Sequence, residues 1–196
     1  MKLYDISQEV FSCAVYPGDP KPVKQLLSST MSGDAYNLTA FSMCAHNGTH
    51  IDAPFHFLDD GKTVEQLDLS VFVGGCYVAR HEGDVTGEAA RSILEKSGGS
   101  ARILIAGPAT VTLEAAEIFA AGGIRLLGNE SQSVGPAEAP MAVHLALLRR
   151  GIALLEGVVL THIPEGRYLL SAAPLNLAGA DGAPCRAILI DMEENT

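Results

Sequence analysis

The segment 46–56 constrains this chain more than any other, since its eleven residues hold three of the six histidines together with an aspartate. Gly48 and Pro54 both disfavour a helix interior, and a proline pushes the residue before it toward an extended conformation. We therefore expect a strand end that runs into a loop. Residues two apart on an extended segment share a face, so His50 and Asp52 should point the same way.

The side chains of this segment are typical of a metal site. Four donors are present: His46, His50, Asp52 and His56. A divalent transition metal binds several imidazoles and carboxylates that converge on one point, and a catalytic site keeps a position open for water. A single histidine is more often an ordinary core or surface residue, but four donors in one loop favour a metal. Gly48 should let the backbone bend His46 in beside the others, and Cys44 is a less favoured additional ligand.

Charge and length limit the classes of protein to which the chain can belong. The 13 basic and 23 acidic residues give a formal charge of −10, which disfavours nucleic acid and anionic membrane surfaces as partners. The first residues lack the apolar region of a secretory signal, and no apolar stretch reaches membrane-spanning length. We expect a cytoplasmic protein with one domain over residues 1–196 and a small-molecule substrate.

The cysteines indicate neither a zinc ribbon nor a thioredoxin-like motif, because no two of them form a CxxC pair. They are Cys13, Cys44, Cys76 and Cys185. In a reducing compartment the simplest interpretation is free thiols. A redox sensor built on Cys13, Cys44 or Cys76 has little support, since no basic cluster lies near them in the sequence.

Strands and helices are predicted to alternate along the chain. Alternating apolar residues predict a strand at 36–43 that leads into the histidine-rich segment. Further strands are expected at 71–78, 102–106, 124–128, 152–156, 168–172 and 186–190, and helices at 86–96, 112–122 and 137–150. This order predicts an α/β fold with helices packed on a mixed sheet.

Two isolated residues add to the candidate site. Glu156 ends an otherwise apolar strand, where a carboxylate either faces solvent or requires a cation or a hydrogen-bond donor. His144 lies in the middle of a predicted helix, and from the residues alone an ordinary helix-face histidine is the simpler interpretation. Gln132 is a candidate contact to substrate or metal, although a polar loop is also a sufficient explanation.

Three segments, in order, resemble the cyclase-like metal-dependent hydrolases, a family that includes bacterial kynurenine formamidase (arylformamidase) and isatin hydrolase. The family signature HxGTHxDxPxHF matches the run from His46 to Phe57 at every fixed position. The loop Tyr16–Pro20 resembles the family's N-terminal substrate loop, and the segment 174–187 resembles its C-terminal part.

The resemblance implies a single domain of the swivelling β/β/α type, usually assembled as a homodimer or a higher homo-oligomer. It also implies a pair of divalent metal ions, zinc or alternatively manganese. His46, His50 and Asp52 would hold one ion, and Asp52, His144 and Glu156 the second. A shared carboxylate is physically sensible, because two cations about 3.5–4 Å apart need an anionic group between them.

The implied activity is metal-assisted hydrolysis of a C–N amide bond, of the kynurenine formamidase type. The resemblance assigns His56 as general acid and base, in keeping with an imidazole that titrates near neutrality. Tyr16 is the candidate substrate contact, standing where the formamidases carry a tryptophan, and this chain has no tryptophan. The alternatives are an isatin-type cyclic-amide hydrolase, a cyclase of the same family, and a non-catalytic metal-binding paralogue.

Overall fold

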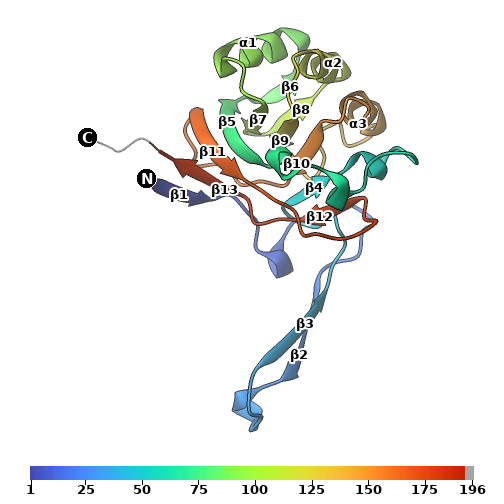
Figure 1. Cartoon of the computed structure of the whole chain (residues 1–196), viewed down its shortest axis with the longest axis vertical. Coiled ribbons are helices and arrows are strands. Elements are labelled where there is room, and N and C mark those ends of the chain that lie inside the picture. The colour runs from blue at the N-terminus through green and yellow to red at the C-terminus, as the bar shows by residue number, and fades with distance from the viewer. Residues whose placement is uncertain (193–196) are drawn as a thin grey trace.

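A nine-stranded mixed sheet forms the centre of the computed structural model, which describes residues 1–192 (Figure 1). The strand order is β1-β13-β11-β5-β7-β9-β10-β4-β12. The bounds in that order are Lys2–Asp5, Ile188–Asp191, Gly166–Ser171, Val73–Arg80, Arg102–Ala106, Leu126–Asn129, Ala153–Glu156, His50–Asp52 and Gly182–Pro184. The four central strands β5, β7, β9 and β10 are parallel, and the strands on both sides of them pair antiparallel.

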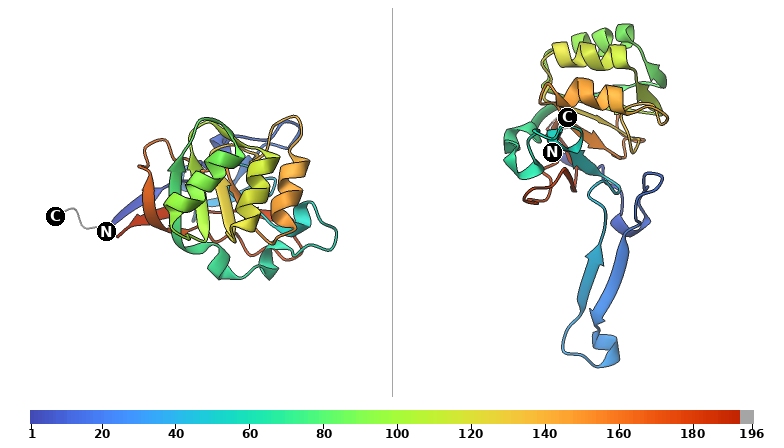
Figure 2. Two further views of the ribbon diagram at one scale, coloured as in Figure 1. Left: turned by 90° about the horizontal axis from the view of Figure 1, so that it is seen from above. Right: turned by 90° about the vertical axis from the view of Figure 1, so that its right-hand side faces the viewer.

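Three helices cover one face of the parallel strands (Figures 1 and 2). They are α1 Gly87–Ser97, α2 Leu113–Ala121 and α3 Met141–Leu148. Alternation along β7 divides the core, because Ile103 and Ile105 pack toward the helices while Leu104 packs into the apolar cluster on the other face. The predicted α/β class, with helices on a mixed sheet, is confirmed.

The sequence signals for helix ends predicted the positions of α1 and α2 correctly. The side chains of Thr86 and Thr112 accept hydrogen bonds from the backbone amides of Ala89 and Ala115, and Gly98 ends α1 in the left-handed conformation. The predicted helix at 137–150 is shorter than expected, since α3 begins only at Met141. The residue before a proline avoids the helical conformation, so Pro140 excludes the preceding residues from the helix.

The predicted strand at 36–43 forms, but it lies outside the central sheet. β3 Leu38–Ser42 pairs antiparallel with β2 Val23–Ser28, and the two project from the body as a long hairpin (Figures 1 and 2). We call residues 20–43 the hairpin arm. As expected, β3 delivers the chain directly to the histidine-rich segment.

Several short elements were not predicted. The strands β1 and β12 are four and three residues long, and β6 Gly83–Val85 pairs with β8 Ala109–Val111 beside the helices. Short 3₁₀ turns occur at Val10–Ser12, Thr30–Ser32, Pro54–His56, Val64–Gln66 and Leu69–Val71. Within residues 1–192, the helices are all too short or too polar to cross a lipid bilayer.

Candidate metal centre and active site

The pairing register of β4 positions the residues at the centre of the site. β4 lies between β10 and β12, and the antiparallel pairing sets His50 directly opposite Glu156. His50 and Asp52 share a face, as predicted, while Ile51 between them points into the apolar core. The His50 Nε2 atom lies 3.4 Å from both Asp52 Oδ1 and Glu156 Oε2, and all three side chains are buried.

His46 reaches the same carboxylate from the preceding loop. Gly48 has a φ of +64°, a left-handed conformation that suits glycine, and it turns the chain between His46 and β4. His46 Nδ1 lies 2.8 Å from Asp52 Oδ1, and its Nε2 atom lies 2.8 Å from Asp181 Oδ2.

His144 enters from α3, on the opposite side of the carboxylates. Its Nε2 atom lies 3.3 Å from Glu156 Oε1 and 3.7 Å from Asp52 Oδ2. The backbone amide of Val134 donates to Glu156 Oε1 at 2.8 Å, which fixes that carboxylate. The structure thus brings together five side chains that the sequence proposed as ligands: His46, His50, Asp52, His144 and Glu156.

The hydrogen bonds of two histidines indicate that this cluster is suited to a cation. His50 Nδ1 donates to the Gly48 carbonyl at 2.9 Å, and His144 Nδ1 donates to the Pro140 carbonyl at 2.8 Å. In the neutral ring each Nε2 then carries a lone pair, which faces carboxylate oxygens. Lone pairs that face each other repel, so a positive charge is required between them, either a proton on the ring or a bound cation. A hydrogen bond from Nδ1 to a carbonyl oxygen is also characteristic of histidines that bind metal through Nε2.

The electrostatics of the buried carboxylates support the same conclusion. Burial lowers the pKa of His50, but its hydrogen bonds to Asp52 and Glu156 outweigh that effect and raise the pKa to about 10. Burial raises the pKa of Asp52, yet His46 and His50 hold it well below its usual range. Asp52 Oδ2 is buried without a hydrogen-bond partner. Imidazoles and carboxylates with a free buried oxygen fit a divalent metal.

A cavity of about 400 Å³ opens onto this cluster. His56 lines the cavity and is partly exposed, and its Nδ1 atom lies 3.2 Å from Asp181 Oδ2. Its ring stacks on His46 with the centroids 4.1 Å apart. Tyr16 lines the outer wall, where its hydroxyl lies 3.5 Å from the Ala137 carbonyl. The cavity therefore joins the candidate acid–base residue, the candidate substrate contact and the carboxylate cluster.

Comparison with known proteins identifies the family. The model of the family described as "Putative cyclase" matches residues 4–136. A kynurenine formamidase from Salinibacter ruber is 36% identical over 97% of this chain and 98% of its own length. Another from Bacillus mycoides is 37% identical, over 94% of this chain and 95% of its own length. This chain belongs to the cyclase family.

Solved structures of similar proteins agree with this family. A protein described as a potential metal-dependent hydrolase with cyclase activity is 28% identical and covers 98% of this chain and 99% of its own, with a TM-score of 0.83. Isatin hydrolase A from Labrenzia aggregata is 21% identical, covers 98% of this chain and 94% of its own, and shares the fold with a TM-score of 0.85. The predicted family, fold and hydrolase class are confirmed.

Asp181 is a site residue of this cyclase-family chain to which sequence reasoning gave no role. One of its oxygens contacts both His46 and His56, although these residues precede it by more than a hundred positions. The signal was an acid between two glycines within the segment 174–187. Gly182 beside it leaves room for the site, because a side chain there would press on the His46 ring.

The structure also places the two residues whose roles the sequence left open. Gln132 lines the cavity and donates through Nε2 to the Gly48 carbonyl at 3.1 Å, so it supports the loop that carries His46. Cys44 also lines the cavity, and its Sγ atom lies 3.8 Å from Asp19 Oδ2. The candidate metal groups that the described residues form do not include Cys44.

Proposed function

We propose that this chain hydrolyses an aryl formamide to formate and the free arylamine. The preferred substrate is N-formylkynurenine. The observation that carries the proposal is the pair of imidazole nitrogens, His50 Nε2 and His144 Nε2, that faces two buried carboxylates at an open cavity. Full-length similarity to kynurenine formamidases, at 31–37% identity, supports the choice of substrate.

The proposed cofactor is a pair of divalent ions, zinc or alternatively manganese, held by His46, His50, Asp52, His144 and Glu156. Asp52 would contribute to both positions, and this is supported by its Oδ1 atom facing His46 and His50 while Oδ2 faces His144. When bound, such ions polarise a carbonyl oxygen and lower the pKa of water. The carboxylates of Asp52 and Glu156 would balance their charge.

The proposed reaction places specific demands on the side chains. A bond forms between a water oxygen and the formyl carbon, the C–N bond breaks, and the leaving nitrogen needs a proton. We assign His56 to take the proton from the water and to pass it to the nitrogen. Asp181 accepts a hydrogen bond from Nδ1 of His56, and the His46 ring supports its face, so the imidazole is held at the cavity wall.

Tyr16 is the proposed contact for the aryl ring of the substrate. Aromatic rings pack favourably on one another, and a cavity of about 400 Å³ lies in the size range of small-molecule sites. The Tyr16 hydroxyl adds a polar group where formamidases of the family carry tryptophan. Cyclic amides of the isatin type are therefore the comparison substrates in the test below.

Two further properties are proposed on separate grounds. The thiols of Cys13, Cys44, Cys76 and Cys185 are free, which suits a reducing compartment and supports a cytoplasmic location. The resemblance to the cyclase family supports a homodimer or a higher homo-oligomer.

The test is reconstitution of the chelated protein with zinc or manganese, one equivalent at a time. Turnover of N-formylkynurenine should rise to a plateau near two equivalents, with isatin turned over more slowly. Faster turnover of isatin would replace the proposed substrate class. Metal uptake with no turnover of either compound would reject hydrolysis and support a non-catalytic metal-binding protein.

A further inference from the structure

Gln8 joins three separate segments of the candidate site through hydrogen bonds. Its backbone amide donates to Thr49 Oγ1 at 2.9 Å, inside the histidine-rich segment. Its side-chain Nε2 atom donates to the Gly157 carbonyl at 2.8 Å, directly after β10. Its Oε1 atom accepts a hydrogen bond from the Ala14 amide at 2.7 Å, two residues before Tyr16. One glutamine thus connects the chain that leads to the candidate substrate contact with the two strands of the candidate metal centre.

The other end of the Ala14 backbone is held by the turn at Gly48. The Gly48 amide donates to the Ala14 carbonyl at 3.0 Å, and the Gly48 carbonyl accepts the hydrogen bond from His50 Nδ1. Gln8 binds the amide of the same alanine, so hydrogen bonds fix both ends of this residue. The path of the chain toward Tyr16 is therefore tied to the turn that orients a candidate metal ligand.

The substrate loop, residues 14–20, has few other polar anchors within the described chain. The Tyr16 hydroxyl lies 3.5 Å from the Ala137 carbonyl, and Cys44 Sγ lies 3.8 Å from an oxygen of Asp19. Both distances are long for a hydrogen bond of their kind. The bond from the Asp19 amide to the Tyr16 carbonyl is internal to the loop. The position of Tyr16 therefore depends on the two hydrogen bonds at the first residue of the loop.

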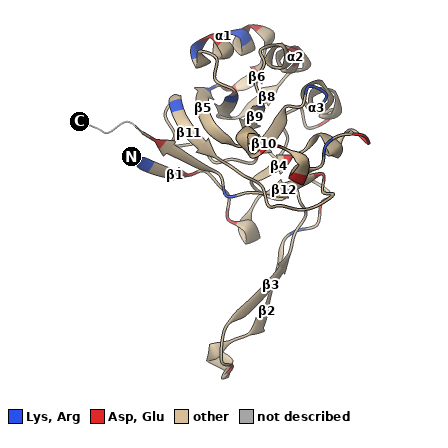
Figure 3. Ribbon diagram, in the orientation of Figure 1, with Lys and Arg blue, Asp and Glu red and all other residues tan. Residues whose placement is uncertain are grey.

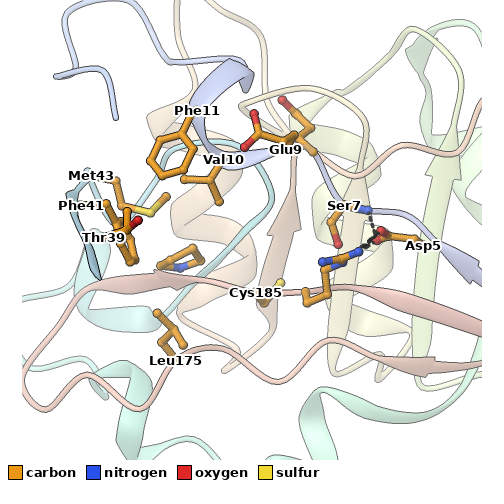
Figure 4. A pocket seen from close by; sticks show the side chains of 13 residues that line it. Asp5, Ser7, Glu9, Val10, Phe11, Thr39, Phe41, Met43, Leu175 and Cys185 are labelled. Atoms are coloured by element: carbon orange, nitrogen blue, oxygen red, sulfur yellow. Dashed lines mark hydrogen bonds and ion pairs between the residues drawn. The ribbon is translucent and has the colours of Figure 1, made fainter. Parts of the chain in front are cut away.

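The neutral amide of Gln8 suits its surroundings. Figure 3 shows that charged side chains gather on the body of the chain and leave the hairpin arm almost bare. Gln8 lies in that body and lines a groove of about 700 Å³, where Figure 4 labels its neighbours Ser7 and Glu9. A glutamine amide supplies one acceptor and one donor group at a fixed spacing, and it adds no charge to a chain that is already acidic.

We propose that Gln8 is a positioning residue for substrate binding, which holds the substrate loop so that Tyr16 stays at the wall of the metal cavity. Its Oε1 atom fixes the Ala14 amide, and its Nε2 atom fixes the glutamine itself against the Gly157 carbonyl. This inference rests on the proposed function, in which Tyr16 contacts the aryl ring. It adds a residue outside the cavity lining that determines how tightly an aryl formamide binds.

Removal of the two side-chain bonds should weaken substrate binding and leave the metal ligands in place. In Gln8→Met the Ala14 amide can bond to water, because Ala14 is exposed. The Gly157 carbonyl keeps a second donor, the Thr49 hydroxyl, at 2.7 Å. The substrate loop is then free to move, while the strand that ends in Glu156 keeps its hydrogen bonds.

The first test is steady-state turnover of N-formylkynurenine by the metal-reconstituted protein. We expect Gln8→Met to raise KM roughly tenfold, with kcat and metal content within about twofold of the wild type. Gln8→Glu keeps an oxygen for the Ala14 amide and should return KM to within about threefold of the wild type. The matched control is Gln66→Met, which loses a bond from the Thr63 amide at 3.2 Å outside the cavity and should leave KM unchanged. A wild-type KM in Gln8→Met, or equal increases in both Gln8 variants, would overturn the proposal.

Amide hydrogen exchange tests the same inference without turnover. The amides of the substrate loop should exchange roughly tenfold faster in Gln8→Met than in the wild type, and at nearly wild-type rates in Gln8→Glu and Gln66→Met. Slow exchange in β7 verifies that each variant is folded. Unchanged exchange of the loop in a folded Gln8→Met would overturn the proposal. If the wild type hydrolysed no aryl formamide, the proposed function would fail, and the exchange rates would still decide whether Gln8 holds the loop.

Discussion

Gly157 offers a direct test of how the candidate metal centre is held together. It follows Glu156 and has a φ of +66°, and a Cβ atom there would overlap the Gly48 carbonyl oxygen and the Gln132 amide. That carbonyl accepts the hydrogen bond from His50 Nδ1 that orients the ring. Gly157→Ala must therefore displace the acceptor that directs His50 toward the carboxylates.

Gly151→Ala is the matched control, because Gly151 has a φ of +71° and a Cβ atom there would meet nothing within 4 Å. A non-glycine residue in the left-handed region costs about 1–2 kcal/mol, and this cost is common to both variants. Overpacking against fixed backbone adds roughly 1–3 kcal/mol for Gly157→Ala. We expect free energies of unfolding lowered by about 1–2 kcal/mol at 151 and by about 2–5 kcal/mol at 157.

Metal affinity should separate the two variants more sharply than stability. Loss of an outer hydrogen bond to a metal-binding histidine typically weakens the metal by about 10–100-fold. We expect that loss for Gly157→Ala and wild-type affinity for Gly151→Ala, measured by competition with a chromogenic chelator. Urea unfolding is followed by circular dichroism, since the chain has no tryptophan. Equal stability losses, or a folded Gly157→Ala that binds metal like the wild type, would refute the reasoning.

Three further predictions concern single side chains. His56→Ala should keep its metal and lose roughly 10²–10⁴-fold in turnover, whereas Asp52→Ala should lose both metal and turnover. Metal content is measured by elemental analysis. Equal metal loss in the two variants would contradict the assignment of His56 to proton transfer and of Asp52 to metal binding. Asp181→Asn should lower kcat roughly tenfold or more with KM little changed, because it weakens the hydrogen bond that supports the His56 ring. An effect confined to KM would show that Asp181 does not position His56. Burial raises the pKa of the Cys76 thiol to about 12, so about one in 10⁴ is ionised at pH 8. Cys76 should resist a thiol reagent in the folded protein and react after unfolding in urea, and its rapid reaction in the native protein would contradict its burial.

The parts of the fold that sequence predicted are those with local signals. Thr86, Thr112 and Gly98 mark helix ends through their own hydrogen bonds or backbone conformation. The apolar run at 103–106 lies within β7. The short strands β1 and β12 lack such signals, since three or four residues carry little periodicity. Alternation at 36–43 predicted a strand correctly but could not show whether the strand would join the central sheet.

The residues of the candidate site also differ in whether the local sequence predicted them. His46, His50, Asp52 and His56 are close in sequence, so their residue types alone indicated a metal site. Glu156 and His144 come from β10 and α3, and only the family resemblance connected them to that segment. Asp181 carried only a weak signal, an acid between two glycines in a loop. Its contact with His46 and His56 depends on the path of a loop that local sequence does not specify.

The spacing of the histidine motif meets two requirements at once, burial of an apolar residue in the core and convergence of the polar site residues. Ile51 is fully buried in the core on one face of β4, and alternation then forces His50 and Asp52 onto the other face, where Glu156 stands opposite His50. A slip of one residue would expose Ile51 to the cavity and drive a carboxylate into an apolar core, so hydrophobic burial selects against it. Pairing with β10 on one side and β12 on the other holds that register from both edges. Burial of an isoleucine therefore fixes the face of β4 on which His50 and Asp52 meet Glu156.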